Sequence, residues 1–172
     1  MNDLLLLALM LGGPKYGYQL KREAGWMSGQ DALHNNIVYP MLRRFSDEGW
    51  VSKKTVPGER GQIRQQHALT AAGRRILMDR LSQFSEADAS MKEAFRLRIG
   101  VFSFLKPDIR ESILTAREQR LERQDERLGA LQGNIDLGKF GGEIIRYMRK
   151  EITMEQEWIQ RLRRMAKATP RG

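Results

Sequence analysis

The sequence of 172 residues contains no cysteine and only two histidines, His34 and His67. The absence of cysteine excludes disulfide bonds, thiol nucleophiles and metal sites built from thiolates. The two histidines fall on different predicted elements, and the sequence has no Ser-His-Asp arrangement, no His-Glu-x-x-His motif and no Gly-x-Gly-x-x-Gly motif. We therefore predict that the chain is not an enzyme and that it binds no metal ion and no cofactor.

Long hydrophobic runs are also scarce. The longest one lies between Leu4 and Leu11, far short of the ~20 apolar residues that a transmembrane helix needs. This run lacks the basic leading region and the small-residue cleavage site of a signal peptide. It predicts a buried first helix, a cytoplasmic protein and no membrane partner.

Basic side chains outnumber acidic ones, 30 against 21, which gives a formal net charge of +9. Such an excess indicates a polyanionic partner, and nucleic acid before an acidic membrane. The excess is spread along the chain, because residues 1–80 hold 12 basic and 7 acidic residues and the remainder holds 18 and 14. Charge alone therefore does not locate a nucleic-acid-binding surface.

Two parts of the sequence differ in their hydrophobic pattern. Residues 1–84 carry turn signals and mixed periods, whereas residues 85–168 follow a helical period almost throughout. Residues 169–172 are predicted to be a flexible tail. We therefore expect a mainly α protein with an N-terminal domain over 1–84 and an all-helical C-terminal domain over 85–168.

The N-terminal part predicts three helices, a hairpin and a fourth helix. The third helix is expected to start at about Ile37, with Asn35 or Asn36 as its cap, and to end before Gly49. Pro40 would then lie within or at the edge of its first turn, where proline is tolerated. The predicted elements are helices at 4–10, 16–24, 37–48 and 70–84 and strands at 50–56 and 63–69. This order is typical of a winged helix-turn-helix domain, in which the third helix reads the major groove and the two-stranded hairpin is the wing.

Residues 4–77 resemble the PadR family of bacterial transcriptional regulators. The resemblance lies in five segments that occur in the family's order and spacing: Gly13-Pro14, 16–20 (YGYQL), 38–45 (VYPMLRRF), 48–51 (EGWV) and 69–74 (LTAAGR). It implies a winged helix domain, a helical C-terminal dimerisation domain and repression of nearby genes, and some relatives respond to phenolic acids or bulky drugs. Residues 91–162 resemble the branch of virulence-gene activators in helix number and length.

One segment and one single residue depart from the family's pattern. The second wing strand reads Gln65-Gln66-His67-Ala68 where the family usually carries tyrosines and basic residues, and Trp50 stands where the family has leucine. The wing contacts and the packing under the wing are therefore carried over less directly than the third helix.

Candidate DNA contacts lie on the predicted third helix, before the second helix and in the wing. Arg43 and Arg44 fall in the second turn of the third helix, and arginine can bond guanine bidentately in the major groove. Arg43 is the stronger candidate, because Arg44 has the alternative of lying against the protein's own surface, and Asn35 and Asn36 have the alternative of capping the helix. The predicted DNA-binding residues are Lys15, Tyr16, Asn35, Asn36, Tyr39, Arg43, Arg44, Lys53, Lys54, Arg60, Gln62 and Arg64.

The last predicted helix, residues 143–166, carries two apolar stripes. One holds Ile145, Met148, Ile152, Ile159 and Leu162, and the other holds Tyr147, Met154, Trp158 and Met165. Two stripes need two partners, of which one can be the chain's own helix and the other a second subunit. The residues assigned to a homodimer interface are Leu4, Leu5, Ile145, Met148, Ile152, Ile159 and Leu162. Those assigned to the pocket of a small aromatic effector are Trp26, Phe102, Tyr147 and Trp158, with core or interface packing as the alternative.

These observations predict a sequence-specific regulator of transcription that binds double-stranded DNA. Two-fold symmetry of a homodimer would match a palindromic operator, and the family resemblance favours repression. The alternative is a winged-helix interaction module that binds protein or RNA, because a fold does not fix a function and the second wing strand is altered. The sequence leaves the operator and the effector open.

Overall fold

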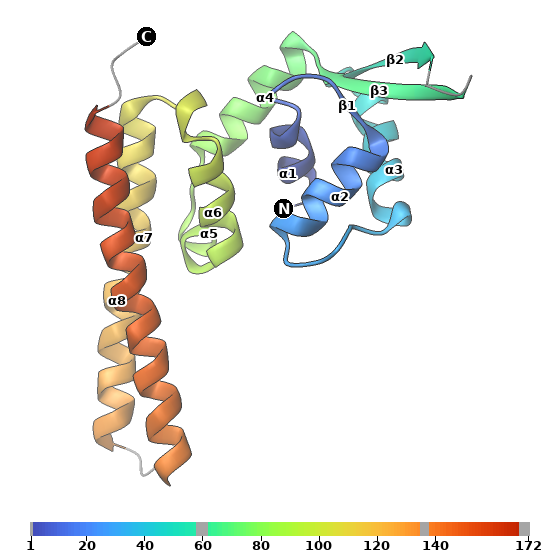
Figure 1. Ribbon diagram of the computed structural model, residues 1–172. Helices are drawn as coiled ribbons and strands as arrows, with labels where there is room; N and C mark the ends of the chain where they lie inside the picture. Colours follow the sequence, from blue (N-terminus) through green and yellow to red (C-terminus); the bar gives the residue numbers. More distant parts are fainter. Residues whose placement is uncertain (1, 58–61, 135–137, 169–172) are drawn as a thin grey trace. The chain divides into compact units, whose positions relative to one another are not determined.

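The computed structural model describes residues 2–57, 62–134 and 138–168 (Figure 1). The chain is mainly helical, as predicted, and forms two compact units, Met1–Gln83 and Phe84–Gly172. We call them the N-terminal unit and the C-terminal unit. Within the described ranges, no helix is both long enough and apolar enough to span a membrane.

The N-terminal unit has the element order of a winged helix-turn-helix domain. Its elements are α1 (Asn2–Leu9), β1 (Lys15–Tyr16), α2 (Gly17–Met27), α3 (Asn35–Asp47), β2 (Val51–Pro57), β3 (Ile63–Leu69) and α4 (Ala71–Ser82). The three strands form an antiparallel sheet in the order β1-β3-β2. The predicted hairpin is present as β2 and β3, with Val51 opposite Leu69 and Pro57 opposite Ile63.

The short strand β1 was not predicted. Tyr16 was assigned to the second helix, but its backbone is extended and it caps α2, while its N–H donates to Gln19 Oε1 at 2.9 Å. Lys15 and Tyr16 pair with His67 and Gln66 of β3. The wing sheet therefore has a third strand, and the second helix starts one residue later than predicted.

Helix α3 starts earlier than predicted, at Asn35, with His34 as its N-cap and without a side-chain capping bond. The predicted caps Asn35 and Asn36 therefore lie in the first turn, and Pro40 lies inside the helix. The end of the helix is as predicted. Gly49 adopts a φ of +71°, and the Trp50 N–H donates to the Phe45 carbonyl at 2.8 Å, which closes a Schellman motif.

A close backbone contact joins the start of α4 to the start of the hairpin. The Thr70 hydroxyl caps α4 by accepting from the Gly73 N–H at 3.0 Å and donates to the Gly49 carbonyl at 2.7 Å. A Cβ placed on Gly73 would lie 2.0 Å from the Trp50 carbonyl oxygen, so only glycine fits there. The end of α3, the start of the hairpin and the start of α4 are therefore in direct contact.

The regular elements among the described residues of the C-terminal unit are all helices. Its elements are α5 (Glu86–Ser90), α6 (Lys92–Gly100), the 3-10 turn η1 (Phe102–Phe104), α7 (Pro107–Asn134) and α8 (Gly138–Ala168). The long helices α7 and α8 lie side by side in antiparallel directions (Figure 1). Their buried residues recur mainly at seven-residue intervals, namely Leu114, Leu121 and Leu128 on α7 and Ile145, Ile152 and Ile159 on α8. This spacing is typical of a coiled-coil pair.

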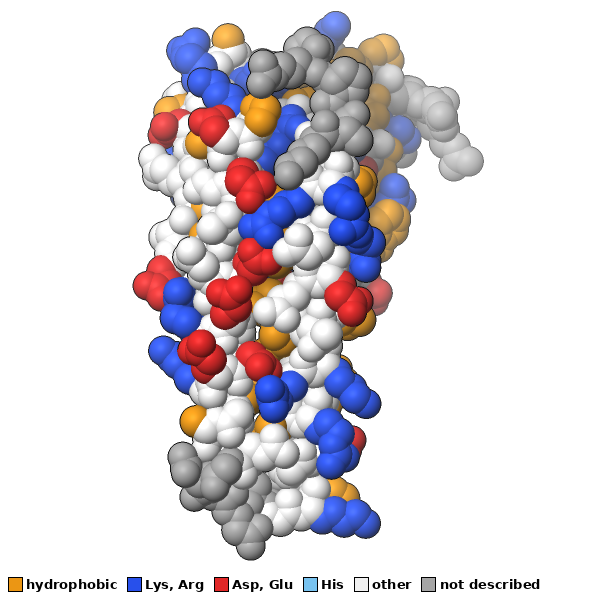
Figure 2. Space-filling view, turned by 90° about the vertical axis from the view of Figure 1, so that its left-hand side faces the viewer, with side chains coloured by type: hydrophobic (Ala, Val, Ile, Leu, Met, Phe, Trp, Pro, Cys, Tyr) orange, Lys and Arg blue, Asp and Glu red, His pale blue; other side chains and the backbone are white. Residues whose placement is uncertain are grey.

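Charged side chains of both signs are interspersed along the face of this unit that Figure 2 shows. Several form ion pairs between the two long helices. Arg149 Nε lies 2.8 Å from Asp125 Oδ1, and Arg163 Nη1 lies 2.7 Å from Glu118 Oε2. The face of the helix pair in this view is therefore a surface of mixed charge.

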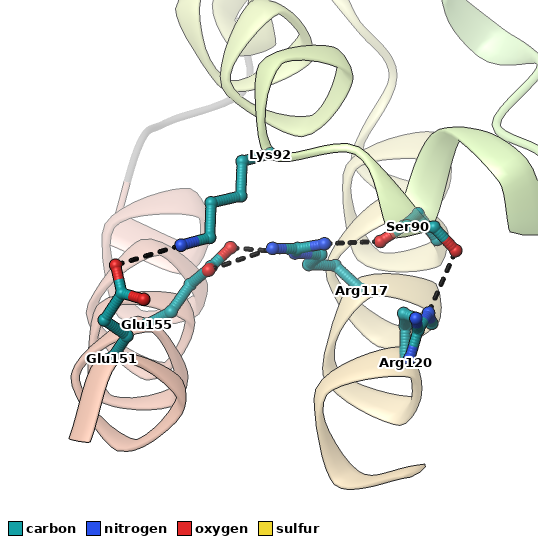
Figure 3. A network of polar contacts seen from close by, with 7 residues as sticks. Ser90, Lys92, Arg117, Arg120, Glu151 and Glu155 are labelled. Atoms are coloured by element: carbon teal, nitrogen blue, oxygen red, sulfur yellow. Dashed lines mark hydrogen bonds and ion pairs between the residues drawn. The ribbon is translucent and has the colours of Figure 1, made fainter. Parts of the chain in front are cut away.

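A buried arginine joins the four helices of this unit. Only 2% of the Arg117 side chain is exposed, and its guanidinium binds both Glu155 oxygens on α8, at 2.8 and 2.9 Å (Figure 3). It also donates to the Ala89 carbonyl of α5 at 2.5 Å and lies over the Phe95 ring of α6. Lys92 of α6 binds Glu151 of α8 nearby, at 3.0 Å. Polar contacts thus fix the position of α5 and α6 on the α7–α8 pair.

Candidate nucleic-acid interface

Helix α3 separates its apolar residues from its polar ones. Val38, Leu42 and Phe45 are buried in the core of the N-terminal unit, where they hold the helix in place. The opposite side of α3 borders a shallow hollow of about 480 Å³. The residues that line this hollow are Asn35, Asn36, Tyr39, Pro40, Arg43, Arg44 and Asp47. Five of the predicted DNA-binding residues therefore share one exposed face of one helix.

The neighbouring arginines of α3 differ in their surroundings. Arg43 is exposed, and within the described part of the chain no hydrogen bond or ion pair engages its guanidinium. Arg44 instead lies over the Phe45 ring, 3.9 Å from Asp3 Oδ2 and 4.0 Å from Glu48 Oε1. Arg43 is thus open to a ligand, whereas Arg44 is drawn toward the protein.

Tyr39 reaches the start of α2. A Cβ on Gly17 would lie 2.9 Å from Tyr39 Cε1, so the glycine at the first position of α2 makes room for this ring. Tyr39 is 46% exposed. The Tyr16 ring stacks on Tyr18 at 5.7 Å and lies under the Arg64 guanidinium at 5.9 Å. The start of α2 therefore packs against Tyr39, and residues of α2 and β3 pack against Tyr16.

Lys15 has a partner within its own unit. Its Nζ lies 3.1 and 2.8 Å from the two carboxylate oxygens of Glu23 on α2. Both side chains are about a quarter exposed. This ion pair partly neutralises the charge of this predicted DNA-binding lysine.

The two predicted lysines of the wing lie on opposite faces of the sheet. Lys53 pairs with His67 and Lys54 pairs with Gln66, and successive residues of a strand alternate in direction. Both lysines are exposed, as is Gln62, whereas Arg64 is half-buried. The predicted contact Arg60 lies outside the described residues. The two lysine side chains therefore point away from the sheet in opposite directions.

His67 is a buried histidine that the sequence analysis did not assign to the core. It is 6% exposed, and Lys15 and Lys53 are its neighbours on the two flanking strands. Burial, and then the charge of Lys53, lower the pKa of His67 below its ordinary value. The imidazole is therefore held neutral at the base of the wing.

The four predicted effector residues are divided between the two units. Trp26 is an exposed residue of the N-terminal unit under the guanidinium of Arg22, whereas the other three belong to the C-terminal unit. Trp158 borders a cavity of about 220 Å³ that neither Phe102 nor Tyr147 lines. The residues that line it are Lys92, Arg96, Glu151, Met154, Glu155, Trp158 and Arg161.

Most residues assigned to a dimer interface are buried in the chain itself. Ile145, Ile152, Ile159 and Leu162 are each 9% exposed or less, and Met148 is half-buried. In the N-terminal unit Leu5 is buried and Leu4 half-buried. Within the chain this stripe of α8 is thus largely buried, so it offers little surface to a second copy.

The second stripe of α8 is the one that remains open. Ile144, Tyr147, Met154 and Met165 are between 53% and 64% exposed. Trp158, in the same stripe, is half-buried and meets Phe95 edge to face, with ring centres 5.7 Å apart. The exposed members of this stripe form a long apolar surface on α8.

Comparisons with known proteins give one consistent result. Residues 6–79 match the transcriptional regulator PadR-like family. The chain is 27% identical over 137 residues to the negative transcriptional regulator PadR of Bacillus subtilis strain 168, over 76% of this chain and 71% of that protein.

Two solved structures are also similar to the chain. The crystal structure of Bacillus subtilis PadR in complex with operator DNA aligns at 19% identity and a TM-score of 0.47, over 95% of this chain and 98% of that chain. A PadR family regulator from Eggerthella lenta aligns at 26% identity and a TM-score of 0.39, over 45% of this chain and 65% of that one. The N-terminal unit therefore contains a domain that matches the PadR-like family of transcriptional regulators.

Proposed function

We propose that this regulator binds double-stranded DNA sequence-specifically through the exposed face of α3 and that it represses transcription as a homodimer on a palindromic operator. The observation that carries the proposal is the guanidinium of Arg43. It projects from a helix whose other face is fixed in the core, and no described group of the protein engages it. Its neighbours Asn35, Asn36 and Tyr39 border the same hollow.

These side-chain types fit the donor and acceptor pattern of the major groove. Arginine pairs bidentately with guanine, and asparagine pairs bidentately with adenine. Contacts to phosphates position a protein, while contacts to base edges specify the sequence. In this assignment Arg43, Asn35 and Asn36 read bases, and the exposed wing lysines bind phosphates.

The repressor part of the proposal rests on the relative. The Bacillus subtilis protein is named a negative transcriptional regulator, and it aligns with most of this chain. A repressor that binds its operator across two half-sites needs two copies of the reading helix.

The homodimer part rests on the open stripe of α8. A second copy that covers Tyr147, Met154 and Met165 would remove their apolar surface from water. The variants Tyr147→Glu and Met154→Glu are expected to give monomers in light scattering. Arg164→Glu, at an exposed position of the same helix, is the matched control and stays dimeric. Dimers that persist in both stripe variants would place the interface elsewhere.

An effector site is proposed at the cavity beside Trp158, for a small aromatic compound. This tryptophan is the member of the predicted set that lines a cavity. The chain has three tryptophans, so a Trp26→Phe and Trp50→Phe variant leaves Trp158 as its only fluorophore of that type. A saturable change of its emission on addition of benzoate supports the site, and an unchanged emission contradicts it.

The test of DNA reading starts with selection of bound duplexes from a random pool by the full chain, at near-physiological salt. An enriched inverted repeat is the expected result. The Arg43→Ala variant should then bind the selected duplex more weakly by about 1–3 kcal/mol and tolerate changes at one base pair of each half-site. Arg75→Ala, an exposed arginine of α4, serves as the control.

Two results would contradict the proposal. One is a pool without enrichment and with binding that fades steeply as salt rises, because this behaviour reports contact with phosphates alone. The other is an Arg43→Ala variant with unchanged affinity and unchanged base preference. The alternative interaction module, which binds protein or RNA, would then explain the exposed α3 surface better.

A further inference from the structure

On the basis of the proposed reading of DNA by α3, we propose that Asp3 determines specificity without touching DNA. Its carboxylate holds Arg44 against the protein and so withholds a second arginine of α3 from the phosphates. Asp3 would thereby suppress binding to non-operator DNA, while Arg43 selects the operator.

The geometry places Asp3 between two arginines of different helices. Asp3 Oδ2, on α1, lies 3.3 Å from Arg80 Nη1 on α4 and 3.9 Å from Arg44 Nη2 on α3. Asp3 Oδ1 accepts a hydrogen bond from the Leu4 N–H at 2.9 Å, which fixes the carboxylate in the first turn of α1. Glu48 adds a second carboxylate 4.0 Å from Arg44 Nε.

An aromatic pair supports the two arginines. Phe45 and Trp50 stack with ring centres 5.9 Å apart. Arg44 lies over Phe45 at 5.3 Å, and Arg80 lies over Trp50 at 4.7 Å. A guanidinium over an aromatic face gains further attraction, so the rings and the carboxylate of Asp3 favour the same position of Arg44.

Arg44 remains close enough to the DNA-facing surface to matter if it is released. It borders the same hollow as Arg43, and half of its side chain is exposed. Neighbouring residues of an α-helix point about 100° apart, so a released Arg44 would extend beside the face that carries Arg43. There it would meet the phosphates next to the groove in any sequence.

The expected consequence is a change in salt dependence. Each additional phosphate contact steepens the plot of log K against log salt by about 0.9 and strengthens binding to every duplex. The ratio of operator to non-operator affinity would fall, because the new contact does not discriminate between them. A purely structural role for Asp3 would instead weaken binding to both duplexes.

The variant Asp3→Asn tests this in the full chain, since asparagine keeps an oxygen for the Leu4 N–H and removes the charge. We would measure its affinity for the selected operator and for a shuffled duplex between 50 and 200 mM salt. The loss of affinity across this range should grow by about 3.5-fold for each released arginine, or about twelvefold for the two copies of the proposed homodimer, and the operator to shuffled ratio should fall. Asp31→Asn, at an exposed position of the same unit, controls for the change in net charge and is expected to behave as the wild type.

Two further variants separate the explanations. Asp3→Asn combined with Arg44→Gln should return the salt slope to the wild-type value, because the released cation is then missing. An unchanged slope in Asp3→Asn, or a parallel weakening on both duplexes, overturns the inference. Arg43→Ala in the same assay reports on the proposed function. If Arg43→Ala lowers the operator to shuffled ratio while Asp3→Asn does not, only the inference about Asp3 fails. If Arg43→Ala leaves the ratio unchanged, the proposed reading of DNA by α3 fails.

Discussion

The substitution Glu155→Leu should strongly destabilise the C-terminal unit, because it leaves a buried arginine without its counterion. Arg117 is 2% exposed at its side chain and loses the two hydrogen bonds of 2.8 and 2.9 Å that Glu155 accepts. Removing one partner of a buried ion pair typically costs about 3–5 kcal/mol. The Ala89 carbonyl and the Phe95 ring still face the guanidinium, so we expect about 3 kcal/mol, the lower end of this range.

The double variant Arg117→Met and Glu155→Leu should recover most of this loss. Replacing a buried ion pair by apolar side chains of similar volume is often neutral or stabilising. We therefore expect the double variant to lie within about 1 kcal/mol of the wild type, so that the effects of the two substitutions do not add. The charge left in the interior, and not the lost packing, would then account for the effect of the single variant.

Hydrogen exchange of the full chain, read by mass spectrometry, measures this effect separately in each unit. The single variant should lose protection in peptides from α5, α7 and α8, while peptides from α3 keep theirs. Arg123→Met, which removes an exposed ion pair with Glu86, is the control and should change protection little. A single variant as protected as the wild type, or a double variant as unprotected as the single one, would refute the reasoning.

Three other predictions concern the pH response, the packing and the assembly. Burial lowers the pKa of His67 below 6.5, so as the pH falls the histidine of the unfolded chain is protonated before that of the folded chain. The urea midpoint of unfolding should therefore fall as the pH drops below 6.5, and a His67→Gln variant should lack this decrease. Gly73→Ala should cost about 1–3 kcal/mol of unfolding free energy, because its Cβ would meet the Trp50 carbonyl. Gly12→Ala is the control, because no atom lies within 4 Å of the added carbon. Equal urea midpoints of the two variants would contradict the clash. A fragment of residues 1–84 lacks α8 and should be monomeric in sedimentation and bind the selected duplex poorly; a tight dimer would place the interface in the N-terminal unit.

The order of the elements could be predicted because it is encoded locally. Apolar periods and turn residues located four helices and the hairpin of the N-terminal unit, and Gly49 marked the end of α3. The strand β1 could not be found in this way. Two residues are too few to show a period, and their extended conformation depends on pairing with β3, about 50 residues further along the chain. Contacts of this range leave no local signal in one sequence.

The sequence indicates which candidate residues share the exposed face of α3, but it does not indicate their partners within the fold. The sequence placed Arg43, Arg44 and Tyr39 on one helix and favoured Arg43, but it could not name the partner of Arg44, because Asp3 lies about 40 residues away. Lys15 was chosen for its position before α2, yet its partner Glu23 sits two turns along the same helix. In both cases an acidic residue elsewhere in the fold decides how much of the positive charge remains for a ligand.

The two apolar stripes of α8 show how the connection between two helices decides which surface is buried within the chain. Both stripes are apolar, and the regular one was assigned to a second copy. Helix α8 begins four residues after α7 ends, so the two helices meet at high effective concentration and at a small entropic cost of loop closure. The regular stripe, Ile145, Ile152 and Ile159, therefore pairs within the chain, because its seven-residue spacing matches that of the α7 leucines. In the proposed homodimer, a second copy would bind to the stripe of methionine and aromatic side chains that remains. Since that encounter is bimolecular, the fraction of dimer should depend on protein concentration.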